Sequence, residues 1–182
     1  MIKQLADYLR PALDFPFIRK TRRNHGLEHA TVHILSKKVE HLRIAGRSTH
    51  NGFVLIGDVP TDKVEEAATE ALDRMRAGEH HLAMHPNCGT NLVTTGTLTA
   101  LVGVLGVGMR RRQGALNHFS WMVTMMMLAA LVAQPLGMDL QKHITTEGDP
   151  GDLELISVSR YRFTVPFIGR PITLHNVVTR KG

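Results

Sequence analysis

The sequence predicts an α+β membrane protein, in which a small α-β-β-α N-terminal domain precedes a two-helix transmembrane hairpin and a C-terminal β-hairpin. Two observations lead to this prediction. Gly89–Met109 and Ala115–Met138 contain no Asp, Glu, Lys or Arg, whereas charged residues are frequent before them. Outside these stretches, apolar residues recur at helical spacing in some segments and in short runs bounded by turn residues in others.

The two uncharged stretches, within residues 89–138, have the length of membrane spans. A helix over 89–109 is about 31 Å long, which matches a hydrocarbon core of about 30 Å. The alternative is a pair of soluble core helices, but that pair would need a larger polar shell than this chain supplies. We therefore expect an integral membrane protein with two spans.

The first 22 residues form a basic amphipathic segment that leads into a cationic cluster, Arg19, Lys20, Arg22 and Arg23. The net charge of +6 would suit nucleic acid, but the other basic residues are scattered and aromatic residues make up only 5% of the chain. A basic cluster near membrane spans is typical of contact with anionic lipid headgroups. The expected partner is a lipid bilayer, with no nucleic acid.

Residues 23–88 are expected to form the α+β polar domain. The segment 25–38 reads as a helix with Asn24 as its N-cap. Asn51-Gly52 stands between two short apolar runs and predicts a β-hairpin. Residues 62–77 read as a second helix that ends at Gly78, and its apolar face comprises Val64, Ala67, Ala68, Ala71, Leu72 and Met75.

Residues 139–182 form the C-terminal segment, which reads as a second β-hairpin turning at Ile168-Gly169-Arg170. In the first span, Gly96 and Ala100, like Thr99 and Gly103, place small residues four apart. Such a face lets another helix approach closely, either the second span or a second copy of the chain in a homo-oligomer.

The orientation signals of the spans disagree. Arg110–Arg112 favour a cytoplasmic connecting loop. An 88-residue folded N-terminal domain, however, is difficult to export. We expect both termini in the cytoplasm.

His25, Glu28 and His29 form the pattern H-x-x-E-H on the first predicted helix. The two histidines lie one turn apart, as two ligands of a single metal ion must. Glu28 lies near enough to take a proton from water on such a metal, and His33 extends the same face. The apolar residues occupy a separate arc, which favours a site over the alternative of a merely solvated face.

A second motif, H-P-N-C-G-T-N, covers His85–Asn91 at the junction with the first span. His85 and Cys88, the only cysteine, can offer imidazole and thiolate to one zinc ion. Asn87, Thr90 or Asn91 is expected to cap the membrane helix, and Asn91 is also a secondary ligand candidate. Glu79 is a further candidate oxygen ligand.

On these motifs, together with RRNHGLEHATVH and AGRSxxNGFxLxGDV, the chain resembles an uncharacterised bacterial family of two-span membrane proteins, a domain of unknown function. The resemblance spans about Arg22 to Thr146 and implies the bacterial cell membrane, but no activity. Separately, residues 25–29 are similar to the inverted zinc motif of the inverzincin metallopeptidases. That similarity implies two zinc-binding histidines, Glu28 as general base and a downstream glutamate, for which Glu79 is the candidate.

The sequence therefore favours a membrane-anchored metalloprotein, with zinc as cofactor and a zinc-dependent hydrolase or peptidase as its activity. His25 and His29 would bind zinc, and His85 or Cys88 would be the third ligand. A site at the membrane surface would suit a membrane-protein or lipid-linked substrate. The alternative is a non-catalytic accessory or scaffold protein with a structural metal site or a histidine hydrogen-bond network.

Overall fold

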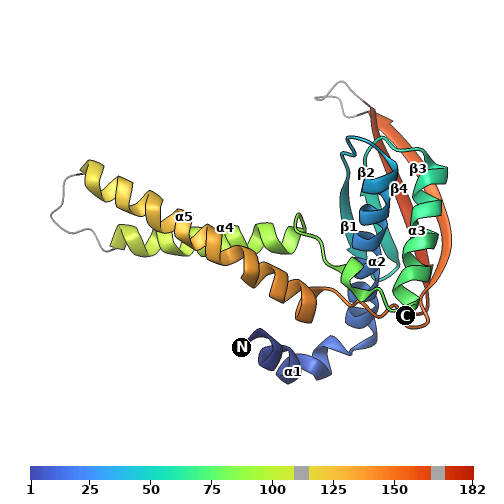
Figure 1. Ribbon diagram of the computed structural model, residues 1–182, viewed down its shortest axis with the longest axis horizontal. Helices are drawn as coiled ribbons and strands as arrows, with labels where there is room; N and C mark the ends of the chain where they lie inside the picture. The colour runs from blue at the N-terminus through green and yellow to red at the C-terminus, as the bar shows by residue number, and fades with distance from the viewer. Residues whose placement is uncertain (109–114, 165–170) are drawn as a thin grey trace. The chain divides into compact units, whose positions relative to one another are not determined.

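The computed structural model describes residues 1–108, 115–164 and 171–182. Within these ranges the chain forms two compact units, which are described separately (Figure 1). The polar unit comprises Met1–His85 and Lys142–Gly182, and the hairpin unit comprises Pro86–Gln141. The expected span end at Met109, the loop 110–114 and the turn at 168–170 lie outside the described residues.

The polar unit begins with two helices, α1 (Ile2–Leu13) and α2 (Pro16–Lys38). The expected start of the histidine helix at His25, with Asn24 as N-cap, was wrong, because α2 begins nine residues earlier. Phe15 is extended and Pro16 occupies the first helical position, where its fixed φ favours a helix and its missing N–H costs nothing. The basic cluster is thus the first part of α2.

Asn24 has a tertiary role instead of the expected capping role. Its side chain is fully buried. The amide donates a hydrogen bond to the Thr49 carbonyl at 2.9 Å and accepts one from the Thr179 hydroxyl at 2.7 Å. Asn24 therefore ties α2 to the strands on which those two residues lie.

The described residues of the polar unit form one antiparallel sheet in the order β1-β2-β4-β3. The predicted hairpin at Asn51-Gly52 is confirmed: Gly52 has a φ of 138°, and a Cβ there would collide with the Val177 carbonyl oxygen. The C-terminal strands are also present, and β4 pairs with β2, so the two hairpins share one sheet. The strands are β1 (Ala45–Thr49), β2 (Gly52–Ile56), β3 (Glu154–Thr164) and β4 (Pro171–Arg180).

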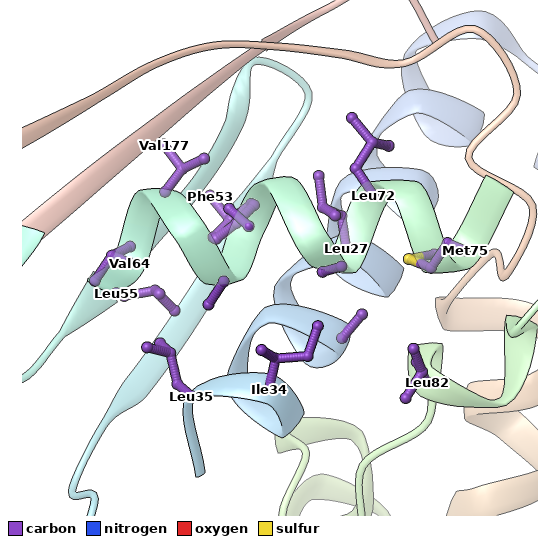
Figure 2. Close-up of a cluster of buried hydrophobic side chains, with 14 of the residues drawn as sticks. Leu27, Ile34, Leu35, Phe53, Leu55, Val64, Leu72, Met75, Leu82 and Val177 are labelled. Carbon is purple, nitrogen blue, oxygen red and sulfur yellow. The ribbon is translucent and has the colours of Figure 1, made fainter. Parts of the chain in front are cut away.

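The core lies where helices α2 and α3 (Thr61–Arg76) pack against this sheet (Figure 2). All six apolar residues expected on the buried face of α3 are buried, as predicted. Gly78, with a φ of 96°, follows the helix end. A short 3₁₀ helix, η1 (His80–Ala83), then adds Leu82 to the core and returns the chain to the side of α2.

The hairpin unit consists of α4 (Gly89–Gly108) and α5 (Ala115–Leu140), which pack along each other. A π-helical turn, η2 (Gln141–Thr145), continues α5. The α4 face at Gly103 and Gly106 receives methionines of α5: an added Cβ at Gly106 would lie 3.2 Å from Met122. Small residues therefore allow the two helices to approach closely.

Both helices are long and apolar enough to cross a membrane. Their most apolar windows lie in Gly89–Gly108 and Asn117–Thr145, with mean hydropathies of 1.4 and 1.6. Only 11% and 6% of those windows are buried within the structure. A soluble core helix would be mostly buried, so this exposure weakens the alternative of two soluble core helices.

Candidate metal centre

Four histidines of the polar unit gather beside α2. The rings of His25 and His29 lie 4.5 Å apart between centroids, as one-turn spacing on a helix dictates. His85, which follows η1, lies 5.9 Å from His29 and 4.9 Å from His33. Sequence spacing predicted the α2 histidines on one face, and the structure adds His85 to them.

Backbone carbonyls fix the protonation of three of these rings. His25 Nδ1 lies 2.9 Å from the Thr145 oxygen, and His29 Nδ1 lies 2.7 Å from the Ala83 oxygen. His33 Nε2 lies 2.8 Å from the Met84 oxygen. A carbonyl oxygen only accepts, so each of these nitrogens carries the hydrogen and donates it. The lone pairs are then on Nε2 of His25 and His29 and on Nδ1 of His33, the arrangement that metal-binding histidines adopt.

The Thr145 carbonyl is positioned by contacts that the sequence did not reveal. Arg22 donates hydrogen bonds to the carbonyl oxygens of Ile144, at 2.8 Å, and Thr146, at 3.2 Å. It also forms an ion pair with Glu147. Gly26 allows the segment to lie against α2, because a Cβ there would collide with one of its carbonyl oxygens. These contacts bring the Thr145 carbonyl to His25.

His85 is half-buried and stays neutral at ordinary pH. Burial, together with the charges of His33 and His29, lowers the pKa of His85 to about 4. A neutral imidazole retains the lone pair that a metal needs. His85 therefore stays a predicted ligand.

Glu28 lies between α2 and β1 in a crowded, nearly dry position. Its side chain accepts a hydrogen bond from the Ser48 hydroxyl, and a Cβ at Gly46 would collide with the Glu28 carboxylate. Burial raises the pKa of Glu28, although the Ser48 hydrogen bond and the charge of His25 oppose the shift. A carboxylate with a raised pKa beside candidate ligands is a typical general base.

Gly46 and Ser48 were missed as site residues, although both belong to the AGRS motif. Gly46 provides room for the carboxylate of Glu28, and Ser48 orients it. The motif was visible in the sequence, but it could not be connected with Glu28 without the contact between β1 and α2.

Cys88 is the candidate sulfur ligand. It belongs to the hairpin unit, whereas His25 and His29 belong to the polar unit. Cys88 follows His85 by three residues, so the chain itself limits its Cα to within about 11 Å of that of His85. The thiol also accepts the Thr90 N–H at 3.4 Å, so Cys88 contributes to the capping of α4.

Two secondary candidates have other partners. Glu79 binds Arg74 through both carboxylate oxygens, at 2.9 and 2.6 Å, and that guanidinium lowers the pKa of Glu79. Asn91 is buried in the hairpin unit, where its amide donates to the Pro86 oxygen and accepts from Gln141. Among the candidates, the metal-ligating potential thus concentrates on histidine and cysteine.

The comparisons with known proteins agree with the resemblance. Residues 20–158 match the family described as Domain of unknown function (DUF6391). An uncharacterised protein of Picosynechococcus sp. (strain ATCC 27264 / PCC 7002 / PR-6) is 36% identical over 156 residues, which cover 80% of this chain and 73% of that protein. A search of solved structures gave no match. The matched range contains the histidine helix, the first hairpin and both apolar helices, and the chain belongs to the DUF6391 family, whose function is unknown.

Proposed function

We propose that this protein is a membrane-anchored metalloprotein in which His25 and His29 bind zinc and Glu28 activates water for a hydrolytic reaction. The supporting observation is that both histidines are bonded to a backbone carbonyl through Nδ1, so both hold Nε2 as the lone-pair nitrogen. His85 or Cys88 supplies the third ligand. Three protein ligands leave the fourth position of a tetrahedral zinc ion open, as catalysis requires.

Glu28 is suited to the role of general base. It is one residue from His29 and three from His25, and burial raises its pKa. Zinc would lower the pKa of bound water and polarise a carbonyl group. Glu28 would take the proton from the attacking water, and Ser48 would hold the carboxylate in position.

The membrane part of the proposal rests on the two apolar helices and their exposure. A site in the polar unit, joined by His85 to the first span, would act near the membrane surface. Membrane proteins and lipid-linked molecules are therefore the proposed substrate classes. Both termini are proposed to lie in the cytoplasm. The small-residue face of α4 stays a predicted contact with a second copy of the chain.

The first test measures bound zinc in the full chain, purified in mild detergent and exposed to zinc before excess metal is removed. Wild type should retain close to one zinc per chain, and His25→Ala/His29→Ala should retain little. The matched control is His80→Ala/His81→Ala, since these neighbouring histidines are exposed. Equal zinc in all three proteins, or none in wild type, would refute the site.

The second test separates metal binding from hydrolysis. Glu28→Gln keeps the size of the side chain and should retain zinc, but should abolish hydrolysis of a membrane-protein or lipid-linked substrate that the wild type cleaves. Glu79→Gln, which changes a carboxylate paired with Arg74, should leave hydrolysis unchanged. Full hydrolysis by Glu28→Gln would exclude this residue as the base.

A structural metal site is the second candidate function, and the number of donors favours it. His85 and Cys88 together with the two α2 histidines would close a tetrahedral site. His85→Ala and Cys88→Ser, tested singly, discriminate the two functions. If the open catalytic site is correct, one of them keeps zinc at full occupancy; if the closed site is correct, both weaken it strongly.

A further inference from the structure

Helix α1 has an apolar stripe that no described residue covers. Its large side chains are exposed: Tyr8 is 83% exposed and Leu5 is 45% exposed. The stripe continues past the helix end, where Phe15 is 60% exposed and Phe17 is 54% exposed. A contiguous set of exposed aromatic and aliphatic side chains marks a contact surface.

This stripe is separate from the packed face of α1. The packed face comprises Ile2 and Ala6, which are buried, and Leu9 and Leu13, which are half-buried. The exposed positions recur at intervals of four and three residues and lie about 100° around the helix from the packed face. They are Met1, Leu5, Tyr8 and Ala12. Polar side chains occupy the remaining arc, at Lys3, Gln4, Asp7 and Arg10.

The charge around the stripe suits an anionic surface. Residues 1–21 contain four basic and two acidic side chains, a net charge of +2, whereas Arg22 and Arg23 form ion pairs with Glu147 and Asp152. Lys3 and Arg10 lie on α1, and Arg19 and Lys20 follow on the first turns of α2. Basic residues beside an exposed apolar stripe are the signature of a helix that lies in the plane of a membrane interface.

We infer that the exposed stripe of α1 lies in the headgroup region of a bilayer that contains anionic phospholipid. The stripe provides aromatic side chains for the boundary with the acyl chains, and the basic residues face the phosphate groups. The inference rests on the membrane half of the proposed function, because the apolar helices bring a bilayer within reach. It does not depend on the metal.

The experiment uses full-length protein with a single tryptophan in vesicles of phosphatidylcholine and phosphatidylglycerol that carry bromine at a shallow acyl position. Trp121→Phe/Tyr8→Trp reports on α1, and the natural Trp121 reports on α5. Trp121→Phe/Tyr161→Trp is the matched control, because Tyr161 is an exposed aromatic residue of β3. Bromine quenching at position 8 should exceed that at position 161 severalfold.

The outcomes separate this inference from the proposed function. Quenching at Trp121 without quenching at position 8 would overturn the inference and leave the membrane anchor standing. No quenching at Trp121 would overturn the anchor itself. A blue-shifted but unquenched emission at position 8 would mean that protein, such as a second copy, covers the stripe, and would also overturn it.

A second experiment varies the charge of the lipid. Quenching at position 8 should fall in vesicles without phosphatidylglycerol and with added salt, because basic side chains lose their partners. Quenching at Trp121 should not change. Equal quenching at position 8 with and without anionic lipid would overturn the assignment of an anionic surface.

Discussion

Replacing Glu28 with glutamine should stabilise the metal-free protein. Glu28 is only 6% exposed, and burial outweighs the Ser48 hydrogen bond and the charge of His25, so its pKa is raised. Glutamine fills the same space, accepts the same Ser48 hydrogen bond and carries no charge to desolvate. We expect a gain of about 1–2 kcal/mol at pH 8.

The pH dependence of this gain follows from the sign of the shift. Below the ordinary glutamate pKa of 4.5, Glu28 is protonated in the folded and the unfolded chain, so the substitution has little effect. As the pH rises above 4.5, the unfolded chain loses its proton first, and the wild type loses stability relative to the variant. The gain is complete above the raised pKa of the folded state.

The assay is thermal unfolding in detergent with a zinc chelator, between pH 4 and pH 8. A gain of this size corresponds to a rise in Tm of about 3–6 °C for a chain of this length. Glu79→Gln is the control of opposite sign, because Arg74 lowers the pKa of Glu79: its effect at pH 8 should be destabilising and should shrink at low pH. A lower Tm for Glu28→Gln at pH 8, or an equal gain at pH 4, would refute the reasoning.

Three further substitutions test the surroundings of the site. Gly46→Ala should cost about 1–3 kcal/mol in unfolding free energy, because its Cβ collides with the Glu28 carboxylate, and should reduce hydrolysis while zinc is retained; full hydrolysis would contradict the proposed role of Glu28. Asn24→Ala removes two buried hydrogen bonds and should lower the unfolding free energy by about 2–4 kcal/mol, as measured by denaturation. Elemental analysis should find the same amount of bound zinc per folded chain as in the wild type. For His85, whose folded pKa is about 4, the zinc-free protein should lose stability as the pH falls from 6.5 towards 4, since only the unfolded chain binds the proton there; an unchanged pH profile for His85→Gln would contradict this.

Local patterns predicted much of the architecture. The charge-free stretches, the Asn51-Gly52 hairpin and the buried face of α3 each depend on neighbours within one element, and the structure contains all three. The start of α2 was mispredicted because Asn24 is a common N-cap residue, whereas Pro16 provides an equally good helix start.

Contacts between distant segments were beyond the sequence. The pairing of β2 with β4 joins residues that are more than 100 positions apart, and no turn signal specifies it. The same holds within the candidate site: the H-x-x-E-H spacing placed His25 and His29 together, but the Thr145 and Ala83 carbonyls that set their tautomers come from other elements. The Ser48 hydrogen bond to Glu28 likewise depends on how β1 packs against α2.

Zinc K-edge X-ray absorption on the full-length, zinc-loaded protein tests the central claim most directly. The account predicts a first shell with at least two imidazole nitrogens at about 2.0–2.1 Å, and a sulfur at about 2.3 Å wherever Cys88 is a ligand. His25→Ala/His29→Ala should retain too little zinc to give this spectrum. A shell of oxygen atoms alone, or a spectrum that this double substitution leaves unchanged, would contradict the assignment of His25 and His29 as the metal ligands.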